Sequence, residues 1–256
     1  MRQDLVGRTI TGVEILQPKC LNIAEDEFQA ALIQATIRNV DYHGKWIRVE
    51  TDQGWLLLNL GMGGEILLTS RDRLPEKYRL VFDFEDGACL AVNFWWFGYA
   101  HYVPLDGLEG HALTAKLGPN AIDLSAEDLH QMLKGQRGGV KAFLLDQSRI
   151  AGIGNAYIHD ILFLARLHPK RKIDSLSAGE IDGLALAIEQ GLRPSLLKGG
   201  AFYETSLNGE KGGFLMEEIL VGYREGGPCP TCGTPIEKIK TGSTSSFICP
   251  ACQPLN

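Results

Sequence analysis

Two Cys-x-x-Cys pairs near the end of the chain restrict its fold more than any other feature of the sequence. Cys229 and Cys232 form the first pair, and Cys249 and Cys252 follow after an interval of sixteen residues. Four thiolates at this spacing fit two short hairpins folded around one tetrahedral ion, which is typical of a zinc ribbon.

Disulfide bonding is the alternative interpretation of these cysteines. The two other cysteines of the chain, Cys20 and Cys89, stand far apart in apolar sequence, unlike the pattern of a secreted disulfide scaffold. We therefore predict one Zn²⁺ ion. Because four sulfur ligands leave no open coordination position, its role is predicted to be structural, and any chemistry must lie elsewhere.

Length and composition place the chain among globular proteins. With 256 residues, 45% hydrophobic and 22% charged, it is long enough for one large domain or two ordinary ones. No window approaches eighteen consecutive apolar residues, and residues 1–7 lack the apolar core of a signal peptide. We therefore expect a cytoplasmic protein with no membrane partner.

The charge of the chain is unevenly distributed. A formal net charge of -6 argues mildly against an obligate nucleic-acid binder. Residues 130–175, however, hold eight Lys and Arg against three Asp and Glu, whereas residues 1–125 hold eleven against seventeen. The basic stretch is consistent with a polyanion site, although a solvated helix face would give the same count.

The first half of the chain has the pattern of a β-sandwich or barrel. Residues 8–16 and 31–40 alternate or run in β-branched residues, and residues 79–84 and 89–94 flank an acidic turn ending at Gly87. These short segments recur at roughly ten-residue spacing with little helix between them. We predict strands in each segment and a hairpin around residues 85–87.

The second half has helical periodicity. Ser125 and Ser177 each begin a capping box, and the second helix is expected to run to about Leu197, before Gly199 and Gly200. Residues 140–146 and 156–167 also carry apolar residues at helical spacing. We place a domain boundary near residues 118–124 and expect a short connecting element over residues 214–224.

Two stretches are candidates for binding. Gly152, Gly154 and Asn155 lead into an expected helix near Ala156, where unpaired backbone amides can hold a phosphate. A plain turn with Asn155 as N-cap is the alternative, but Lys141, Arg149 and the basic run 170–172 favour phosphate.

Met62, in a glycine-rich turn, and the aromatic run 94–97 are the other candidates, because large apolar residues on tight loops can be inserted between bases. Buried packing is the alternative for them. Lys45, between Gly44 and Trp46, is a further cation whose role the surrounding sequence alone leaves open. The histidines show no spacing for a second metal, and neither a nucleophile elbow nor a Walker-type loop is present.

Several segments in the same order resemble the formamidopyrimidine-DNA glycosylase and endonuclease VIII family. They are residues 60–64 (LGMGG), 117–119 (LGP), 141–146 (KAFLLD), 152–155 (GIGN), 167–169 (LHP), the Gly199-Gly200 loop and the two Cys-x-x-Cys pairs. The resemblance implies an α+β protein with an N-terminal antiparallel β-sandwich over 1–118, a helix-two-turn-helix domain over 119–224 and a zinc ribbon over 225–256. It implies a monomer, associated with the nucleoid, that binds double-stranded DNA containing a lesion.

The resemblance also implies site residues. Lys45 corresponds to a lysine of the catalytic site that contacts phosphate beside the extruded nucleotide, and Asn155, after Gly152 and Gly154, to the asparagine that holds the backbone. Lys141 corresponds to the lysine before that motif. Met62 and Phe97 correspond to residues that fill the gap left by an extruded base, and the neighbouring Trp96 is expected to contact DNA by stacking.

Two departures from the family are expected to matter. Members begin with a Pro-Glu segment, whose N-terminal amine attacks the sugar C1′ and forms a Schiff base. Residues 1–8 align after that segment, so we expect it to be missing from this chain. In the ribbon, Thr244 stands where members commonly place a phosphate-binding arginine, and Trp95 and Trp96 replace arginines before Phe97.

The resulting prediction is a base-excision-repair DNA glycosylase with abasic-site lyase activity. A non-catalytic binder of damaged or bent DNA is the alternative, and a zinc-ribbon RNA-binding protein is a third possibility.

Overall fold

The computed structural model describes residues 1–95 and 97–255, so the prediction made for Trp96 lies outside the described residues. The chain forms two compact units. Unit 1 contains Met1–Lys116 and Phe202–Gly212, and unit 2 contains Leu117–Ala201 and the chain from Gly213 onward. The loop 202–212 is therefore part of unit 1, although it follows the longest helix of unit 2 in sequence.

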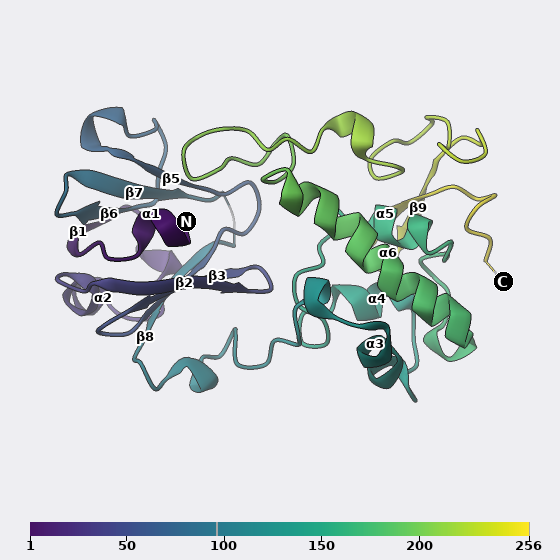
Figure 1. Ribbon diagram of the computed structural model, residues 1–256, viewed down its shortest axis with the longest axis horizontal. Helices are drawn as coiled ribbons and strands as arrows, with labels where there is room; N and C mark the ends of the chain where they lie inside the picture. The colour runs from purple at the N-terminus through teal and green to yellow at the C-terminus, as the bar shows by residue number, and fades with distance from the viewer. Residues whose placement is uncertain (96, 256) are drawn as a thin grey trace. The chain divides into compact units, whose positions relative to one another are not determined.

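Unit 1 consists of two four-stranded antiparallel sheets (Figure 1). One sheet has the strand order β1-β6-β7-β5 and the other has the order β2-β3-β4-β8. The elements are α1 (Arg2–Leu5), β1 (Ile10–Ile15), α2 (Glu25–Leu32), β2 (Ile37–His43), β3 (Trp46–Thr51), β4 (Trp55–Asn59), β5 (Glu65–Ser70), β6 (Leu80–Phe84), β7 (Ala88–Asn93) and β8 (Tyr99–Val103).

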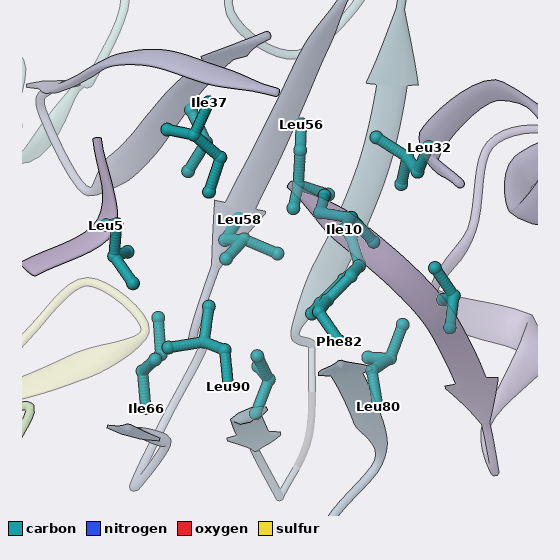
Figure 2. Packing of buried hydrophobic residues seen from close by; sticks show 14 of the residues in the cluster. Leu5, Ile10, Leu32, Ile37, Leu56, Leu58, Ile66, Leu80, Phe82 and Leu90 are labelled. Carbon is teal, nitrogen blue, oxygen red and sulfur yellow. The ribbon is translucent and has the colours of Figure 1, made fainter. Parts of the chain in front are cut away.

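The two sheets enclose one hydrophobic core, which confirms the predicted β-sandwich. Both sheets contribute apolar side chains to it, and Figure 2 shows how they meet between the strands. The strands β6 and β7 place alternate residues on opposite faces, as a pleated strand requires. The core side chains that are essentially inaccessible to solvent include Leu5, Ile10, Phe28, Leu32, Leu56, Leu58, Leu80, Phe82, Val92 and Phe94.

The hairpin predicted around residues 85–87 is confirmed. The strands β6 and β7 pair antiparallel from Leu80 opposite Val92 to Asp83 opposite Cys89. Gly87 has a φ of +82° in the connecting turn, a conformation that glycine adopts without strain.

The strand predicted over residues 31–40 is wrong for its first part. Residues up to Leu32 belong to helix α2, and β2 begins only at Ile37. Three acidic residues in the first turn of α2 stabilise the helix by interacting with the positive end of its dipole. Phe28 and Leu32 lie one turn apart on the same face and are both buried. A helix of eight residues has too few turns for its periodicity to be separated from that of a following strand.

Unit 2 contains the helices α3 (Ala126–Leu133), α4 (Val140–Leu145), α5 (Ile158–Leu164) and α6 (Ala178–Leu197), and the hairpin strands β9 (Glu237–Thr241) and β10 (Thr244–Ile248). Both predicted capping boxes are present, with Ser125 before α3 and Ser177 before α6. No helix in the described part of the chain is long and apolar enough to cross a membrane. The connecting element expected over 214–224 contains a 3₁₀ turn, Met216–Glu218.

The ribbon shares a small core with the helices of unit 2. Phe163 from α5 packs with Val221, Ile236 and Phe247 and with the buried cysteines of the ribbon. Asp160, also on α5, accepts hydrogen bonds of 2.8 to 2.9 Å from the backbone N–H groups of residues 220–222. The chain leading into the ribbon is thus fixed to the helical core before the first cysteine is reached.

A buried pair of histidines lies in unit 1, beside the turn that carries Lys45. His101 Nδ1 lies 2.8 Å from His111 Nε2, and His111 Nδ1 lies 2.7 Å from Thr114 Oγ1. Trp46 packs against both imidazoles, at centroid distances of 5.8 and 5.6 Å. Burial lowers the pKa of both, that of His101 to about 4, and the second imidazole contributes to the shift of the first.

This pair makes unit 1 sensitive to acid. As pH falls from 6.5 towards 4, the unfolded chain takes up a proton that the folded His101 does not, so the free energy of unfolding should decrease, by on the order of 2 to 3 kcal/mol. Above pH 6.5 the imidazole is neutral in both the folded and the unfolded chain, so His101 should no longer make the free energy of unfolding depend on pH. All four tryptophans fall within residues 46–96, so denaturant unfolding followed by tryptophan fluorescence reports on unit 1.

The control for this experiment is His101→Gln, which keeps a polar side chain but cannot titrate. The variant should show a shallower dependence of unfolding free energy on pH between 6.5 and 4 than the unmodified chain. Equal slopes for the two proteins would contradict the assignment.

Candidate metal centre and nucleic-acid interface

The four predicted zinc ligands come together at one point of unit 2, which confirms the predicted metal site. The sulfur atoms of Cys229, Cys232, Cys249 and Cys252 all lie within 4.8 Å of one another. Individual separations are 3.8 Å for Cys229–Cys252, 3.4 Å for Cys232–Cys249 and 3.5 Å for Cys232–Cys252. Four Zn–S bonds of about 2.3 Å in a tetrahedron separate the sulfurs by about 3.8 Å. The site therefore fits one structural Zn²⁺.

Backbone groups around the ribbon orient the ligands. The N–H of Thr231 points to Cys229 Sγ and the N–H of Cys252 points to Cys249 Sγ, each at 3.4 Å. Gly233, with a φ of +75°, lets the chain turn so that its N–H donates to the Cys229 carbonyl at 2.9 Å. Such N–H···S contacts stabilise thiolate charge, as the outer shell of a metal site must.

Gln253, directly after the last ligand, attaches the ribbon to the segment that follows α5. Its side chain is completely buried; it accepts from the Cys249 N–H at 3.1 Å and donates to the Leu167 carbonyl at 2.9 Å. One amide therefore links a zinc ligand to the helical core.

Lys141, predicted to contact DNA, has its ammonium buried against the ribbon hairpin. The residue lies on α4 and is only 4% exposed. Its Nζ lies 2.7 to 3.1 Å from four oxygens, those of the Thr241, Thr244 and Ser246 hydroxyls and of the Ser245 carbonyl. Burial lowers the pKa of Lys141 to about 8. Helix α4 thereby fixes the hairpin turn, a contact between residues a hundred positions apart.

The Gly152–Asn155 turn differs slightly from its prediction. Helix α5 begins at Ile158 rather than near Ala156, because the Gly154 carbonyl accepts from the N–H groups of both Tyr157 and Ile158 in a preceding turn. Gly152 has a φ of +108°, and Asn155 is exposed. Within the described residues no hydrogen bond involves the Asn155 side chain, so its amide is available for a ligand.

Gln147, which the sequence did not single out, holds this turn in place. Its Oε1 accepts from the Gly152 N–H at 3.0 Å, and its Nε2 donates to the carbonyls of Ile153 and Leu145 at 2.9 and 3.0 Å. The only signal in the sequence is an amide five residues before a glycine, which is too common to be diagnostic.

The Lys45 turn and the Met62 loop are joined at one end of the sandwich. Lys45 follows Gly44 in the two-residue turn between β2 and β3, is exposed, and makes no ion pair or side-chain hydrogen bond with the described residues. The protein nearby nevertheless lowers the pKa of its ammonium by desolvation. Asn59, a second residue that the sequence did not reveal, donates to the Lys45 carbonyl at 3.3 Å and accepts from the Gly61 N–H at 2.9 Å.

The aromatic loop between β7 and β8 lies beside the Met62 loop. Glu65, just after the Met62 loop, pairs with Asn93, just before the aromatic run. A Cβ atom at Gly63 would lie 3.4 Å from the Trp95 ring. Together these contacts place both loops at the same end of their sheet.

The apolar side chains of these loops face solvent. Met62 is 68% exposed, Trp95 65% and Phe97 76%. Phe97 also has a φ of +62°, which is uncommon for an aromatic residue. The alternative of buried packing is therefore excluded for these three residues, whereas Phe94 of the same run does belong to the core.

Comparisons with known proteins cover nearly the whole chain. Three family models match: the formamidopyrimidine-DNA glycosylase N-terminal domain at residues 1–93, the formamidopyrimidine-DNA glycosylase H2TH domain at residues 117–206, and the zinc finger found in FPG and IleRS at residues 226–255.

Individual relatives agree with these matches. The formamidopyrimidine-DNA glycosylase of Chloroflexus aurantiacus is 34% identical over 98% of this chain and 92% of its own length, and that of Pectobacterium atrosepticum is 31% identical over 97% and 93%. A solved complex between Lactococcus lactis Fpg and DNA containing an abasic site has a TM-score of 0.90, at 27% identity, over 99% of this chain and 95% of that one.

The sandwich, the helical unit and the four-cysteine site correspond to the three domains that these family models describe. The chain belongs to the formamidopyrimidine-DNA glycosylase family. The N-terminal domain of that family is present from residue 1, so the comparisons do not support the expectation that its catalytic segment is missing.

Loss of a zinc ligand should act on unit 2 alone, because all four ligands belong to it. We expect Cys249→Ala to lower the zinc content measured by mass spectrometry from one ion per chain to near zero, and to unfold the ribbon. The tryptophan-detected unfolding midpoint of unit 1 should stay unchanged. Cys89→Ala, at a buried cysteine remote from the four ligands in sequence, is the control and should retain the zinc.

Proposed function

We propose that the protein is a base-excision-repair DNA glycosylase with abasic-site lyase activity, acting on a damaged base in double-stranded DNA. One observation carries this proposal: Met62 and Phe97 are exposed on adjoining loops at the end of the sandwich that also presents Lys45. The relatives named above are formamidopyrimidine-DNA glycosylases, and the Lactococcus lactis protein was solved with DNA containing an abasic site.

This arrangement suits the physical problem of reaching a base inside a duplex. The sugar C1′ of a stacked nucleotide is inaccessible, so the enzyme must extrude the nucleotide and fill the gap that it leaves. Exposed apolar side chains held on short loops can enter the base stack and offset part of the cost of unstacking. Lys45, charged and without a protein partner in the described structure, can contact a phosphate beside the extruded nucleotide.

The Gly152–Asn155 turn supplies a backbone contact from unit 2. Glycines allow a phosphate to approach the main chain, and the exposed Asn155 amide can donate a hydrogen bond to it. Gln147 keeps this turn in one conformation before DNA binds, so less ordering entropy is lost on binding.

Lys141 has an indirect role in this proposal. Its ammonium already contacts four oxygens of the hairpin, so it positions the ribbon instead of meeting DNA directly. This revises the direct contact that the family resemblance implies.

The lyase step requires an amine that attacks C1′. Attack displaces the damaged base and leaves a Schiff base between the amine and the opened sugar, and loss of a C2′ proton then expels the 3′ phosphate. In the family this amine belongs to the N-terminal proline of the Pro-Glu segment, and residues 1–17 of this chain contain no proline. Lys45 stays a predicted catalytic residue, because its exposed ammonium can contact the phosphate beside the extruded nucleotide.

Borohydride reduction tests the proposed chemistry, because it converts the Schiff base to a stable adduct. We expect a covalent complex between an abasic duplex and a form of the protein that begins with a Pro-Glu segment, and the chain of the printed sequence is assayed beside it. The same protein with glycine in place of that proline is the control and should give no adduct. Lys45→Ala should reduce adduct formation at limiting protein and leave unfolding unchanged, since its side chain has no described partner. Duplex binding with no adduct from any of these proteins would contradict the glycosylase–lyase assignment.

Two substitutions separate a DNA contact from a fold contact. Asn155→Ala should weaken duplex binding by about 1 kcal/mol and leave the stability of unit 2 nearly unchanged. Lys141→Met removes the donor to four hairpin oxygens and should instead destabilise unit 2, by roughly 1 to 3 kcal/mol.

Fluorescence anisotropy measures the binding, and circular dichroism during heating follows the helices of unit 2. Gln190→Ala, an exposed amide on α6, is the control and should change neither quantity. Equal duplex affinity for Asn155→Ala and the unmodified protein would remove the phosphate assignment of the turn.

A further inference from the structure

We propose that Trp46 is a positioning residue for Lys45. Together with Tyr99, His101 and His111 it forms a cluster of four rings, called the ring cluster below, that holds one end of the Lys45 turn. The inference rests on the proposed function, in which the Lys45 ammonium contacts the phosphate beside an extruded nucleotide. Trp46 is itself only 6% exposed, so it acts through Lys45.

The Lys45 turn transmits any movement of Trp46 directly. His43 pairs with Trp46, so only Gly44 and Lys45 lie between β2 and β3. Gly44 has a φ of +58°, which glycine adopts without strain in a two-residue hairpin turn. Because Lys45 is bonded to the first residue of β3, a displacement of Trp46 moves the Lys45 backbone with it.

The ring cluster lies on the face of its sheet that points away from the sandwich core. Val49 of β3 and Ala100 of β8 belong to the core. Since side chains alternate along a strand, Trp46, Tyr99 and His101 point to the opposite face. That face would be open to water without the segment that follows β8, which contributes the fourth ring of the cluster.

Packing against three rings fixes the Trp46 indole. It is stacked on Tyr99, with centroids 5.8 Å apart and an interplanar angle of 18°. It meets His111 edge-on at 5.6 Å and 82°, and it lies 5.8 Å from His101. Such aromatic pairs stabilise a structure beyond the area that they bury. The indole N–H makes no hydrogen bond with the described residues, so ring packing alone sets its position.

Hydrogen bonds fix the two imidazoles on which Trp46 packs. His111 lies between its partners, with Nε2 2.8 Å from His101 Nδ1 and Nδ1 2.7 Å from Thr114 Oγ1. Burial lowers the pKa of both imidazoles, so they are neutral near pH 7 and do not repel the Lys45 ammonium. The ring cluster therefore presents a fixed, uncharged surface beside the cation.

Asn59 holds the same turn from the neighbouring strand. It donates to the Lys45 carbonyl at 3.3 Å and stands opposite Tyr99 in the β4–β8 pair. The Lys45 backbone is thus restrained at two points, its own carbonyl and the residue that follows it. Only the side chain of Lys45 has to be ordered when a phosphate binds, which lowers the entropic cost of the contact.

A double-mutant cycle on the full chain tests the proposal. Binding to a duplex with a stable abasic-site analogue is measured by anisotropy over a range of salt concentrations. Lys45→Ala should weaken binding about tenfold and make the slope of log K against log salt shallower by about 1. Trp46→Leu should weaken binding several-fold and also make the slope shallower. When Lys45 is already alanine, Trp46→Leu should change the affinity by less than about twofold.

Two further variants separate positioning from stability. Trp46→Phe keeps a ring and loses only an unused N–H, so it should retain most of the affinity and the original slope. Trp55→Leu is the matched control, because Trp55 pairs with Glu50 at the end of β3 remote from the Lys45 turn. It removes an indole from the same sheet and should leave affinity and slope unchanged. Circular dichroism verifies that each variant is folded.

A second route through the ring cluster serves if Trp46→Leu does not fold. His111→Gln removes one ring of the cluster and takes the place of Trp46→Leu in the cycle. It should weaken binding in the presence of Lys45 and have no further effect when Lys45 is alanine. Independent losses for Lys45 and the ring-cluster residue, or an equal loss in Trp55→Leu, would overturn the positioning role.

The positioning role and the proposed function can fail separately. If the two losses are independent while borohydride trapping succeeds, the positioning role is wrong and the glycosylase assignment stands. If trapping fails but Trp46→Leu acts only when Lys45 is present, the positioning role is supported and the proposed catalytic function is wrong. Unchanged duplex affinity in Lys45→Ala would overturn the positioning role whatever trapping shows.

Discussion

The contact between the Lys141 ammonium and the hairpin turn is the interaction on which the organisation of unit 2 depends. A buried cation loses hydration energy worth several kcal/mol, and no ion pair among the described residues compensates Lys141. Its compensation comes from four oxygen dipoles, all belonging to residues 241–246. Any displacement of the hairpin would leave the charge unsatisfied, so the contact fixes the hairpin relative to α4 more narrowly than apolar packing would. The zinc ion and Gln253 restrain the other end of the same ribbon.

In both units, some residues hold a loop in place by hydrogen bonds while neighbouring residues of that loop are exposed and available to a ligand. Asn59 and Gln147 use their amides to brace loops, and each has its hydrogen bonds within the protein. The residues next to them, Lys45, Met62 and Asn155, are exposed. A side chain that is not needed for folding is free to bind a ligand. When hydrogen bonds already hold its loop in one conformation, little conformational entropy is lost on binding. Exposed apolar residues on such loops are therefore better explained by binding than by packing.

The sequence predicted features that depend on local spacing and missed those that depend on contacts between distant segments. The cysteine pairs, the capping boxes at Ser125 and Ser177 and the hairpin at Gly87 each have a fixed spacing, and the structure confirms all of them. The roles of Asn59 and Gln147 have no such spacing. Lys141 is the clearest case, because its hydrogen-bond partners lie about a hundred residues later in the chain. Family resemblance predicted that its ammonium contacts DNA, whereas in the structure it contacts the ribbon hairpin. The same applies to helix α2, whose eight residues carry too little periodicity to be recognised.

The net charge of the chain is a poor guide to its partner, and the structure explains why. Many basic side chains are paired within the fold: Arg71 with Glu14 and Asp83, Arg48 with Asp41, and Arg171 with Glu180. An ion pair cancels most of the electrostatic potential of its cation at the surface, although the cation still counts in the net charge of the chain. Lys45, Lys170 and Lys172 have no such partner among the described residues, so they act at close range despite the excess of acid elsewhere. For a polyanion, the cations left unpaired at a site determine attraction, and an acidic chain can present several of them.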